Sequence, residues 1–395
     1  MTTLAVNTHH RPGPVRWLRI WITRCLARPL RRGSGTRRFR AAIVKVDRLG
    51  DFVLALSAIR HALSHFGEDQ CLLIISPYAV ELAEQEFPRT PRMVLSMALG
   101  HRSLWQQGMK ARALLQKVSC DEVVCFRHQR WDWDELILLW LGARRCHVLD
   151  DVESQQYFAA QTTFRFQYPD GRISLTASSS QQLQGSALLC RELWLHQQLL
   201  AAAIGRSFSA DEILPRFSCD LGQPFARGIV VSPYSSRAIK DIPEKVLMSA
   251  LREAQLHTSD SITLHGDSNQ RERMLGLEAR LRAGGVRNVS CAPTVRLSEF
   301  IRVVHGSRLV LTADTVTAHI AAALDRPAVV LIGGGHFGQF GPWRRSGRQI
   351  WLTNQLDCFG CNWSCIYPEP YCLTRIALDS VRVAVAGALK EGASA

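Results

Sequence analysis

A short apolar run that passes through a tight turn into a helical pattern sets the class of fold. Residues 41–46 are rich in β-branched and apolar side chains, as buried strands are, and apolar residues recur at helical spacing from Val53 to Leu63. Gly50 and Asp51 stand at the turn. In open parallel sheets the edge where strands end is where ligands bind. Asp51 is therefore a candidate site residue, although as a helix N-cap it would be purely structural.

The same alternation of strand and helix patterns continues along the chain and restarts in its second half. The length of 395 residues suits two domains, and the alternation predicts that each holds a doubly wound parallel sheet. A polar segment at 151–182 is expected to be surface loop. Further strands are predicted at 71–75, 92–95, 122–126, 228–231, 261–267, 308–315 and 328–332.

The excess positive charge lies at the N-terminus. Of a formal net charge of +14, residues 1–40 supply ten Arg with no Lys, Asp or Glu, so the rest of the chain is only mildly basic and does not indicate a nucleic-acid-binding fold. On a helical wheel Arg16, Arg19 and Arg24 lie opposite an apolar face. We expect this helix to lie on an anionic membrane surface; a transit peptide and a nucleic-acid-binding tail are the alternatives. The apolar face comprises Trp17, Leu18, Trp21, Ile22, Cys25 and Leu26.

The twelve cysteines fall into two groups. Eight are scattered among apolar runs, as reduced core residues are. The other four, Cys358, Cys361, Cys365 and Cys372, have the spacing C-x2-C-x3-C-x6-C. Four thiolates in so short a segment are candidate ligands for Zn or an iron–sulfur cluster, and reduced structural thiols or disulfides are the alternative.

Residues that suit an anion follow two strand patterns of the second half. Ser235, Ser236 and Lys240 come after the run at 228–231, and hydroxyl and ammonium groups suit phosphate oxygens. The run at 308–315 leads into a helix, whose first N–H groups form an anion site. A diphosphate between that helix start and Lys240 would contact amides on one side and an ammonium on the other.

Two further features of this half have alternative interpretations. His319 lies within the helix that begins at Val316, where a hydrogen-bonded core histidine is the usual role. The triplet Gly333–Gly335 follows a strand pattern, and glycine there would let a ligand approach the backbone closely.

Taken together, these motifs resemble glycosyltransferase family nine, the ADP-heptose:lipopolysaccharide heptosyltransferases and their relatives. The matching stretches, in the family's order, are 46–51, 235–243, 313–324 and 341–343. The resemblance implies a GT-B fold, in which two Rossmann-like domains face each other across a cleft. The predicted parts are a membrane-surface arm at 1–40, an acceptor domain at 41–215, a nucleotide-sugar domain at 222–373 with a Cys-rich segment at 358–372, and a helix at 374–395 that crosses back to the first domain.

The resemblance also implies roles for single residues. Asp51 would be the general base that deprotonates the acceptor hydroxyl, and Lys240 would stabilise the departing diphosphate. No divalent metal or other cofactor is needed for such a transfer. The donor-binding residues implied by the likeness are Ser235, Ser236, Lys240, Asp314, Thr315, Val316 and His319.

The sequence therefore predicts an inverting, metal-independent bacterial glycosyltransferase. Its donor would be a nucleotide-sugar, with ADP-heptose favoured, and its acceptor a lipid-linked lipopolysaccharide or other cell-surface glycan. The arm would hold the protein on the inner face of the cytoplasmic membrane, as a cytoplasmic peripheral membrane protein. The alternatives are a GT-B sugar-nucleotide epimerase and a protein built around a four-cysteine metal site or nucleic-acid binding.

Overall fold

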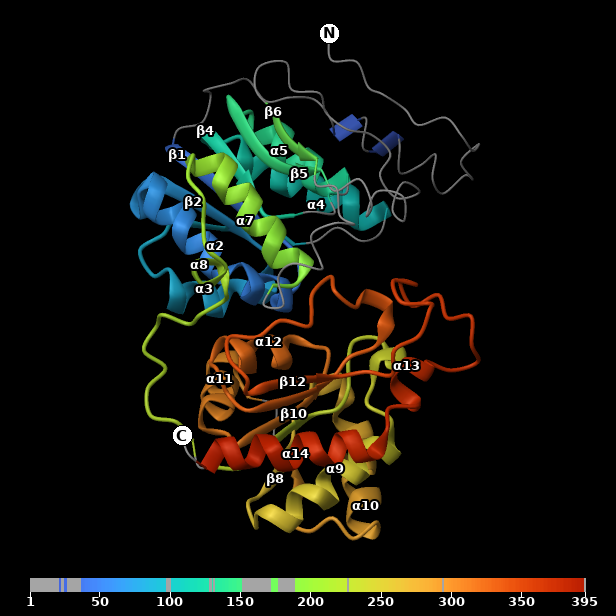
Figure 1. Cartoon of the computed structure of the whole chain (residues 1–395). Helices are drawn as coiled ribbons and strands as arrows, with labels where there is room; N and C mark the ends of the chain where they lie inside the picture. The colour runs from blue at the N-terminus through green and yellow to red at the C-terminus, as the bar shows by residue number, and fades with distance from the viewer. Residues whose placement is uncertain are drawn as a thin grey trace. The chain divides into compact units, whose positions relative to one another are not determined.

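The chain forms two compact units, each built on one six-stranded sheet (Figure 1). The N-terminal unit is Met1–Gly185 with Trp194–Ile213, and the C-terminal unit is Ser186–Leu193 with Leu214–Ala395. The computed structural model describes residues 21–22, 25–26, 37–96, 101–127, 130, 132–150, 172–176, 189–225, 227–292 and 295–393.

The N-terminal unit has the strand order β3-β2-β1-β4-β5-β6, with every neighbouring pair parallel. Its central strand β1 is long and fully buried over its second half, as its β-branched sequence predicts. The elements are β1 (Arg37–Lys45), α2 (Leu49–Phe66), β2 (Cys71–Ile75), α3 (Val80–Glu86), β3 (Arg92–Val94), α4 (His101–Leu115), β4 (Val118–Cys125), α5 (Asp132–Leu141), β5 (Arg145–Asp150), β6 (Arg172–Thr176), α7 (Arg191–Ile204) and α8 (Ala210–Ile213).

The C-terminal unit repeats this plan with the strand order β12-β11-β10-β7-β8-β9, again all parallel. The prediction of two doubly wound parallel sheets is therefore confirmed. The elements are β7 (Ile229–Ser232), the 3-10 turn η3 (Ala238–Lys240), α9 (Glu244–His257), β8 (Ile262–Leu264), α10 (Arg271–Ala283), β9 (Val289–Cys291), α11 (Leu297–Gly306), β10 (Leu309–Ala313), α12 (Val316–Ala323), β11 (Ala328–Leu331), β12 (Gln349–Leu352), α13 (Tyr371–Thr374) and α14 (Leu378–Ala393).

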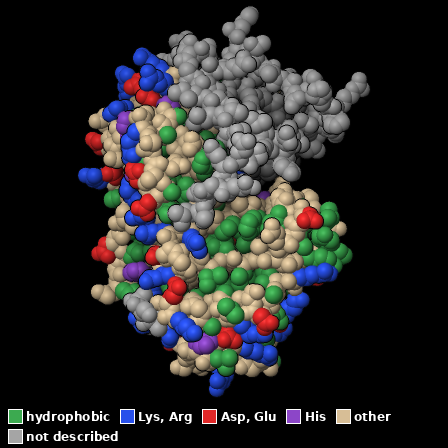
Figure 2. Space-filling model, viewed as in Figure 1, with side chains coloured by type: hydrophobic (Ala, Val, Ile, Leu, Met, Phe, Trp, Pro, Cys, Tyr) green, Lys and Arg blue, Asp and Glu red, His purple; other side chains and the backbone are tan. Residues whose placement is uncertain are grey.

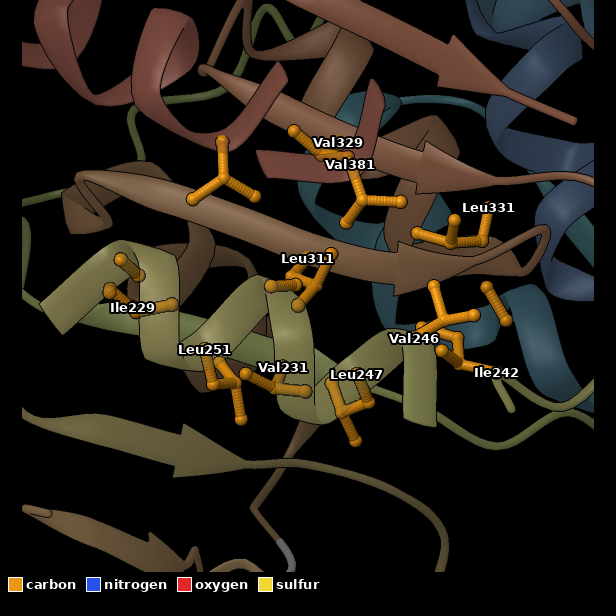
Figure 3. Close-up of a cluster of buried hydrophobic side chains, with 14 of the residues drawn as sticks. Ile229, Val231, Ile242, Val246, Leu247, Leu251, Leu311, Val329, Leu331 and Val381 are labelled. Carbon is orange, nitrogen blue, oxygen red and sulfur yellow. The ribbon is translucent and has the colours of Figure 1, made fainter. Parts of the chain in front are cut away.

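The C-terminal helix α14 packs on the C-terminal unit itself. Figure 3 shows Val381 beside Leu311 and Val329 of the sheet, in the same apolar cluster as residues of α9. Val381, Val385 and Leu389 recur at helical spacing and are each at most 1% exposed, so one face of α14 is buried within this unit. The C-terminal helix was expected to cross back to the first domain, whereas α14 belongs to the second.

Part of the basic arm packs into the core of the N-terminal unit. Ile22 and Leu26 are buried with residues of α4 and α5, and the Leu26 carbonyl accepts hydrogen bonds from Arg112 and Trp140, each at 3.1 Å. Gly108 of α4 makes this contact possible, because a Cβ there would lie 2.6 Å from a Leu26 methyl group. One part of the arm's apolar face is therefore buried in the protein core, and another part lies at the surface. Residues 1–20 of the arm lie outside the described residues.

Two more expectations meet the structure in part. Within the segment at 151–182 that was expected to be loop, Arg172–Thr176 pairs with β5 as strand β6, and the remaining residues of that segment lie outside those described. Within the described ranges, no helix is both long and apolar enough to cross a membrane. Figure 2 shows Lys and Arg interspersed with Asp and Glu on the described surface, in keeping with a body that is only mildly basic.

Candidate functional site

Asp51 lies at the carboxyl end of β1, in the first turn of α2. The N-cap position is Arg48, whose backbone is extended, so Asp51 is the third residue of the helix and not its cap. The Asp51 side chain is partly exposed at the start of an 18-residue helix. The N-terminal end of a helix dipole stabilises a carboxylate. Asp51 is therefore not the N-cap of this helix, which was the structural alternative for this residue.

The ends of β1 and β4 hold a cluster of buried charges, one of which, Arg127, is influenced by Asp51. Lys45 is fully buried; its ammonium lies 3.0 Å from an Asp47 carboxylate oxygen and donates to the Phe126 carbonyl at 2.8 Å. Arg127 follows β4 and lies 3.6 Å from Asp47 and 3.2 Å from Asp134 of α5. Burial alone would lower the pKa of Arg127, but Asp134, Asp47 and then Asp51 raise it, so the guanidinium stays charged.

This cluster is not among the candidate site residues predicted from the sequence. Its only signal is that Lys45 and Asp47 interrupt an otherwise apolar strand and that Arg127 directly follows another. A buried ion pair of this kind adds little net stability, but losing one partner leaves an uncompensated buried charge and costs roughly 3–5 kcal/mol. Lys45, Asp47, Arg127 and Asp134 therefore form one buried charge cluster, and Asp51 at the start of α2 lies close enough to this cluster to help raise the pKa of Arg127.

In the C-terminal unit the structure brings Lys240 and Asp314 together, although 74 positions separate them. The two residues follow β7 and β10, which are parallel neighbours in the sheet. The Lys240 ammonium lies 3.3 Å from an Asp314 carboxylate oxygen, and the two side chains are 15% and 6% exposed. Because both strands end at the same edge, this pair stands where open parallel sheets bind ligands.

The two serines near Lys240 are placed differently from each other. The Ser235 hydroxyl donates to the Arg237 carbonyl at 3.3 Å and accepts from the Arg237 N–H at 3.1 Å, while the Ser235 N–H donates to Asp241 at 2.8 Å. Ser235 is buried and Ser236 is exposed. Ser235 thus shapes the turn that carries Lys240, and contact of either hydroxyl with a donor remains a prediction.

The start of α12 has the expected place beside Asp314. Thr315 occupies the N-cap position with extended backbone, and its hydroxyl lies 3.3 Å from that of Thr312. Val316 is the first helical residue, so its N–H is among those that an α-helix leaves without a partner inside the helix. These amides remain candidates for an anion.

His319 belongs to the interior of the C-terminal unit. Its Nδ1 accepts a hydrogen bond from the Trp343 indole N–H at 3.1 Å, and the two rings stack. Burial lowers the pKa of His319 to about 4, against a smaller opposing effect of Asp314, so the imidazole is neutral at pH 7. This is a structural role, and the donor-binding role given to His319 remains a prediction.

The Cys-rich segment packs against the glycine triplet. A Cβ on Gly333 or Gly335 would lie within 2.5 Å of the Trp363 ring, and one on Gly334 would lie 2.3 Å from Phe359. The glycines therefore make room for aromatic rings of residues 358–372, where the sequence suggested a ligand. Burial raises the pKa of Cys365, with Cys361, Cys372 and Cys358 as nearby contributors, so the thiols lie near one another. Even so, the described part of the chain contains no group of three or more His, Cys, Asp or Glu suited to a metal ion, and the predicted Zn or iron–sulfur site has no support.

Comparisons with known proteins agree with this fold. Residues 205–364 match the family described as glycosyltransferase family 9 (heptosyltransferase). The chain is 31% identical over 126 residues to lipopolysaccharide heptosyltransferase 1 of Pseudomonas aeruginosa; the match covers 28% of this chain and only about a third (34%) of that relative.

Solved structures extend the likeness to most of the chain. The E. coli heptosyltransferase WaaC with ADP has a TM-score of 0.58 at 19% identity, covering 90% of this chain and 100% of that one. A glycosyltransferase of family 9 from Veillonella parvula has a TM-score of 0.64 at 13% identity, covering 90% and 98%. At these identities the likeness concerns the fold.

The two parallel-sheet units thus define the GT-B class of fold. Within that class the predicted resemblance to glycosyltransferase family 9, a family of sugar-transferring enzymes, is confirmed.

Proposed function

We propose that this protein is an inverting, metal-independent glycosyltransferase that uses a nucleotide-sugar donor. The observation that carries the proposal is the Lys240–Asp314 pair at the ends of β7 and β10, inside the region that matches the glycosyltransferase family. A departing diphosphate gains negative charge as its bond to the sugar breaks, and a fixed cation at that point stabilises the transition state. Lys240 supplies this charge, as a divalent metal does in other enzymes.

The proposed reaction is a single displacement at the anomeric carbon. Asp51 takes the proton from the acceptor hydroxyl, the resulting oxygen nucleophile forms a bond to the anomeric carbon, and the bond from that carbon to the diphosphate breaks. The configuration inverts because attack and departure occur on opposite faces. Asp51 of the N-terminal unit acts on the acceptor, and Lys240 of the C-terminal unit acts on the donor.

The donor we favour is ADP-heptose, and the acceptor a lipid-linked lipopolysaccharide precursor. Support comes from the names of similar proteins: a lipopolysaccharide heptosyltransferase among the curated relatives, and a WaaC structure with ADP-2-deoxy-2-fluoro heptose among those of the same fold. A sugar-nucleotide epimerase would use the same cation for a diphosphate but would require no glycan acceptor.

The donor can be identified by thermal shift. A ligand that binds only the native state stabilises it by mass action and so raises Tm. At a ligand concentration of a hundred times Kd, the free energy of unfolding rises by about 2.7 kcal/mol. We expect ADP and ADP-heptose to raise Tm more than UDP, GDP or CDP and their common sugar conjugates. A larger shift with another nucleotide-sugar would change the donor and keep the class, and no shift with any of them would contradict the proposal.

We also propose that the protein lies on the inner face of the cytoplasmic membrane through its basic arm. Trp21 is 59% exposed and stacks on Trp105 of α4, which is 41% exposed, at 6.4 Å between ring centroids. Exposed indole rings beside an Arg-rich segment suit the headgroup region of an anionic bilayer.

Flotation with phosphatidylglycerol vesicles tests this membrane contact. Trp21→Ala with Trp105→Ala should reduce the bound fraction and leave Tm nearly unchanged, because Ile22 and Leu26 keep their buried places. Deleting residues 1–38 would instead remove core packing, so it is a poorer test. Equal flotation of the double variant and the wild type would rule the two tryptophans out as the contact.

A further inference from the structure

Trp363 of the Cys-rich segment lies against the cation that we assign to the donor diphosphate. The Lys240 ammonium is 5.2 Å from the centroid of the Trp363 ring, which is within the range of a cation–π interaction. The same ammonium is paired with Asp314 at 3.3 Å. Lys240 is therefore held from two sides, by a carboxylate and by the face of a ring.

Trp363 itself is fixed from below by the glycine triplet. Its ring covers Gly333 and Gly335, and the Asn362 N–H donates to the Gly335 carbonyl at 3.1 Å. A second backbone hydrogen bond, from Gly360 N–H to the Gly334 carbonyl at 2.8 Å, ties the same loop to the triplet. The ring is 5% exposed, so it is a packed part of the C-terminal unit.

The backbone at this point adopts an unusual conformation. Asn362 and Trp363 have φ angles of +49° and +65°, a region that residues other than glycine rarely adopt. Such conformations persist only where surrounding contacts over-determine them, and they cluster at functional sites. Here the conformation turns the Trp363 ring between the glycine triplet and Lys240.

A neighbouring histidine contributes packing without charge. His336 Nε2 lies 2.7 Å from the Asn362 side-chain oxygen, and its ring meets Trp363 edge-on at 6.1 Å between centroids. Burial lowers the pKa of His336 despite the opposing hydrogen bond to Asn362. This lowered pKa favours the neutral imidazole, so that His336 brings little competing charge to the ring that Lys240 meets.

We propose that Trp363 is a positioning residue that fixes the Lys240 ammonium, so that this one residue of the Cys-rich segment forms part of the diphosphate site. A lysine side chain is long and flexible, and ordering it upon binding lowers affinity. A ring face and a carboxylate that order it beforehand remove much of that loss. The role in donor binding rests on the proposed function, whereas the positioning of Lys240 does not.

A double-mutant cycle on ADP affinity tests whether Trp363 acts through Lys240. Trp363→Leu should weaken ADP binding roughly 5- to 30-fold in a titration calorimeter, whereas Trp363→Phe keeps a ring face and should lose little. Phenylalanine also removes no hydrogen bond, because the buried Trp363 indole N–H has no partner among the described residues. In a Lys240→Met background, Trp363→Leu should cause no further loss.

Phe359→Leu is the matched control, since it removes the other ring that packs on the glycine triplet. It should leave ADP affinity unchanged. A loss from Trp363→Leu that is equal in the wild-type and Lys240→Met backgrounds would overturn the proposal, as would an equal loss from Phe359→Leu.

A second readout needs no nucleotide. Lysines carrying ¹³C-methyl groups give separate NMR signals, and the Lys240 signal is the one that Lys240→Met removes. The ring current of Trp363 should shift it, and Trp363→Leu should move it toward the position of exposed lysines. An unmoved signal would overturn the positioning role. If the wild type bound no nucleoside diphosphate, the proposed function would fail and this measurement would still decide the role of Trp363.

Discussion

Asp51→Asn should lower the turnover of sugar transfer by about 10²- to 10⁴-fold, the usual contribution of a general base, while ADP affinity stays unchanged. The amide has the size of the carboxylate but cannot take the proton from the acceptor hydroxyl. Asp51 lies in the N-terminal unit and the donor residues in the C-terminal unit, so the two effects should separate. Initial rates at saturating donor, together with calorimetry for ADP, measure both quantities.

Asp121→Asn is the matched control for this variant. Asp121 carries an exposed ion pair with Arg38 at 2.9 Å on β1 and β4, and losing such a pair costs at most about 1 kcal/mol. Its transfer rate should match the wild type. Joint loss of turnover and ADP affinity in Asp51→Asn would show that Asp51 is structural, and nearly full turnover would show that the base lies elsewhere.

The second large effect is expected from Lys240→Met. Hydrogen bonds to charged groups contribute about 1.5–3 kcal/mol, so ADP affinity should fall roughly 10- to 100-fold. Turnover should fall as well, because the charge of the leaving diphosphate grows in the transition state. Calorimetry with ADP and with adenosine separates the phosphate contribution: adenosine affinity should stay the same.

Lys245→Met on α9 provides the comparison, since Lys245 is exposed and only five positions away. Removing Lys240 also leaves the Asp314 carboxylate, 6% exposed, without this ion pair, so Lys240→Met should lower Tm. Binding is therefore measured well below the Tm of the variant. Unchanged ADP affinity in a folded Lys240→Met protein would remove Lys240 from the site.

The parts of the structure that follow from local pattern were predictable from the sequence. The strand and helix periods gave the central strands β1, β7 and β10, and with them the position of Asp51 at a strand end. That Lys240 and Asp314 meet follows from the same logic, because both come at the carboxyl ends of parallel strands. Which strands are neighbours is a tertiary fact, which the structure shows and the local pattern does not.

The parts that depend on contacts between distant segments could not be predicted. Nothing local to Gly333–Gly335 shows that the ring of Trp363, about thirty positions later, fills the space that glycine leaves. The burial of Lys45 and Arg127 likewise depends on β1 and β4 being neighbours. A hydroxyl such as that of Ser235 has the right chemistry for a phosphate, yet its own turn uses it.

The most direct test of the central claim is the release of ADP from ADP-heptose by the purified full chain, with and without a heptose-deficient lipopolysaccharide acceptor. We expect release that depends on the acceptor, yields a glycan heavier by one heptose, and is nearly lost in Asp51→Asn. A glycan whose mass is unchanged after the reaction, or ADP release by Asp51→Asn at the wild-type rate, would contradict the account. This chain would then not be an inverting glycosyltransferase with Asp51 as its base.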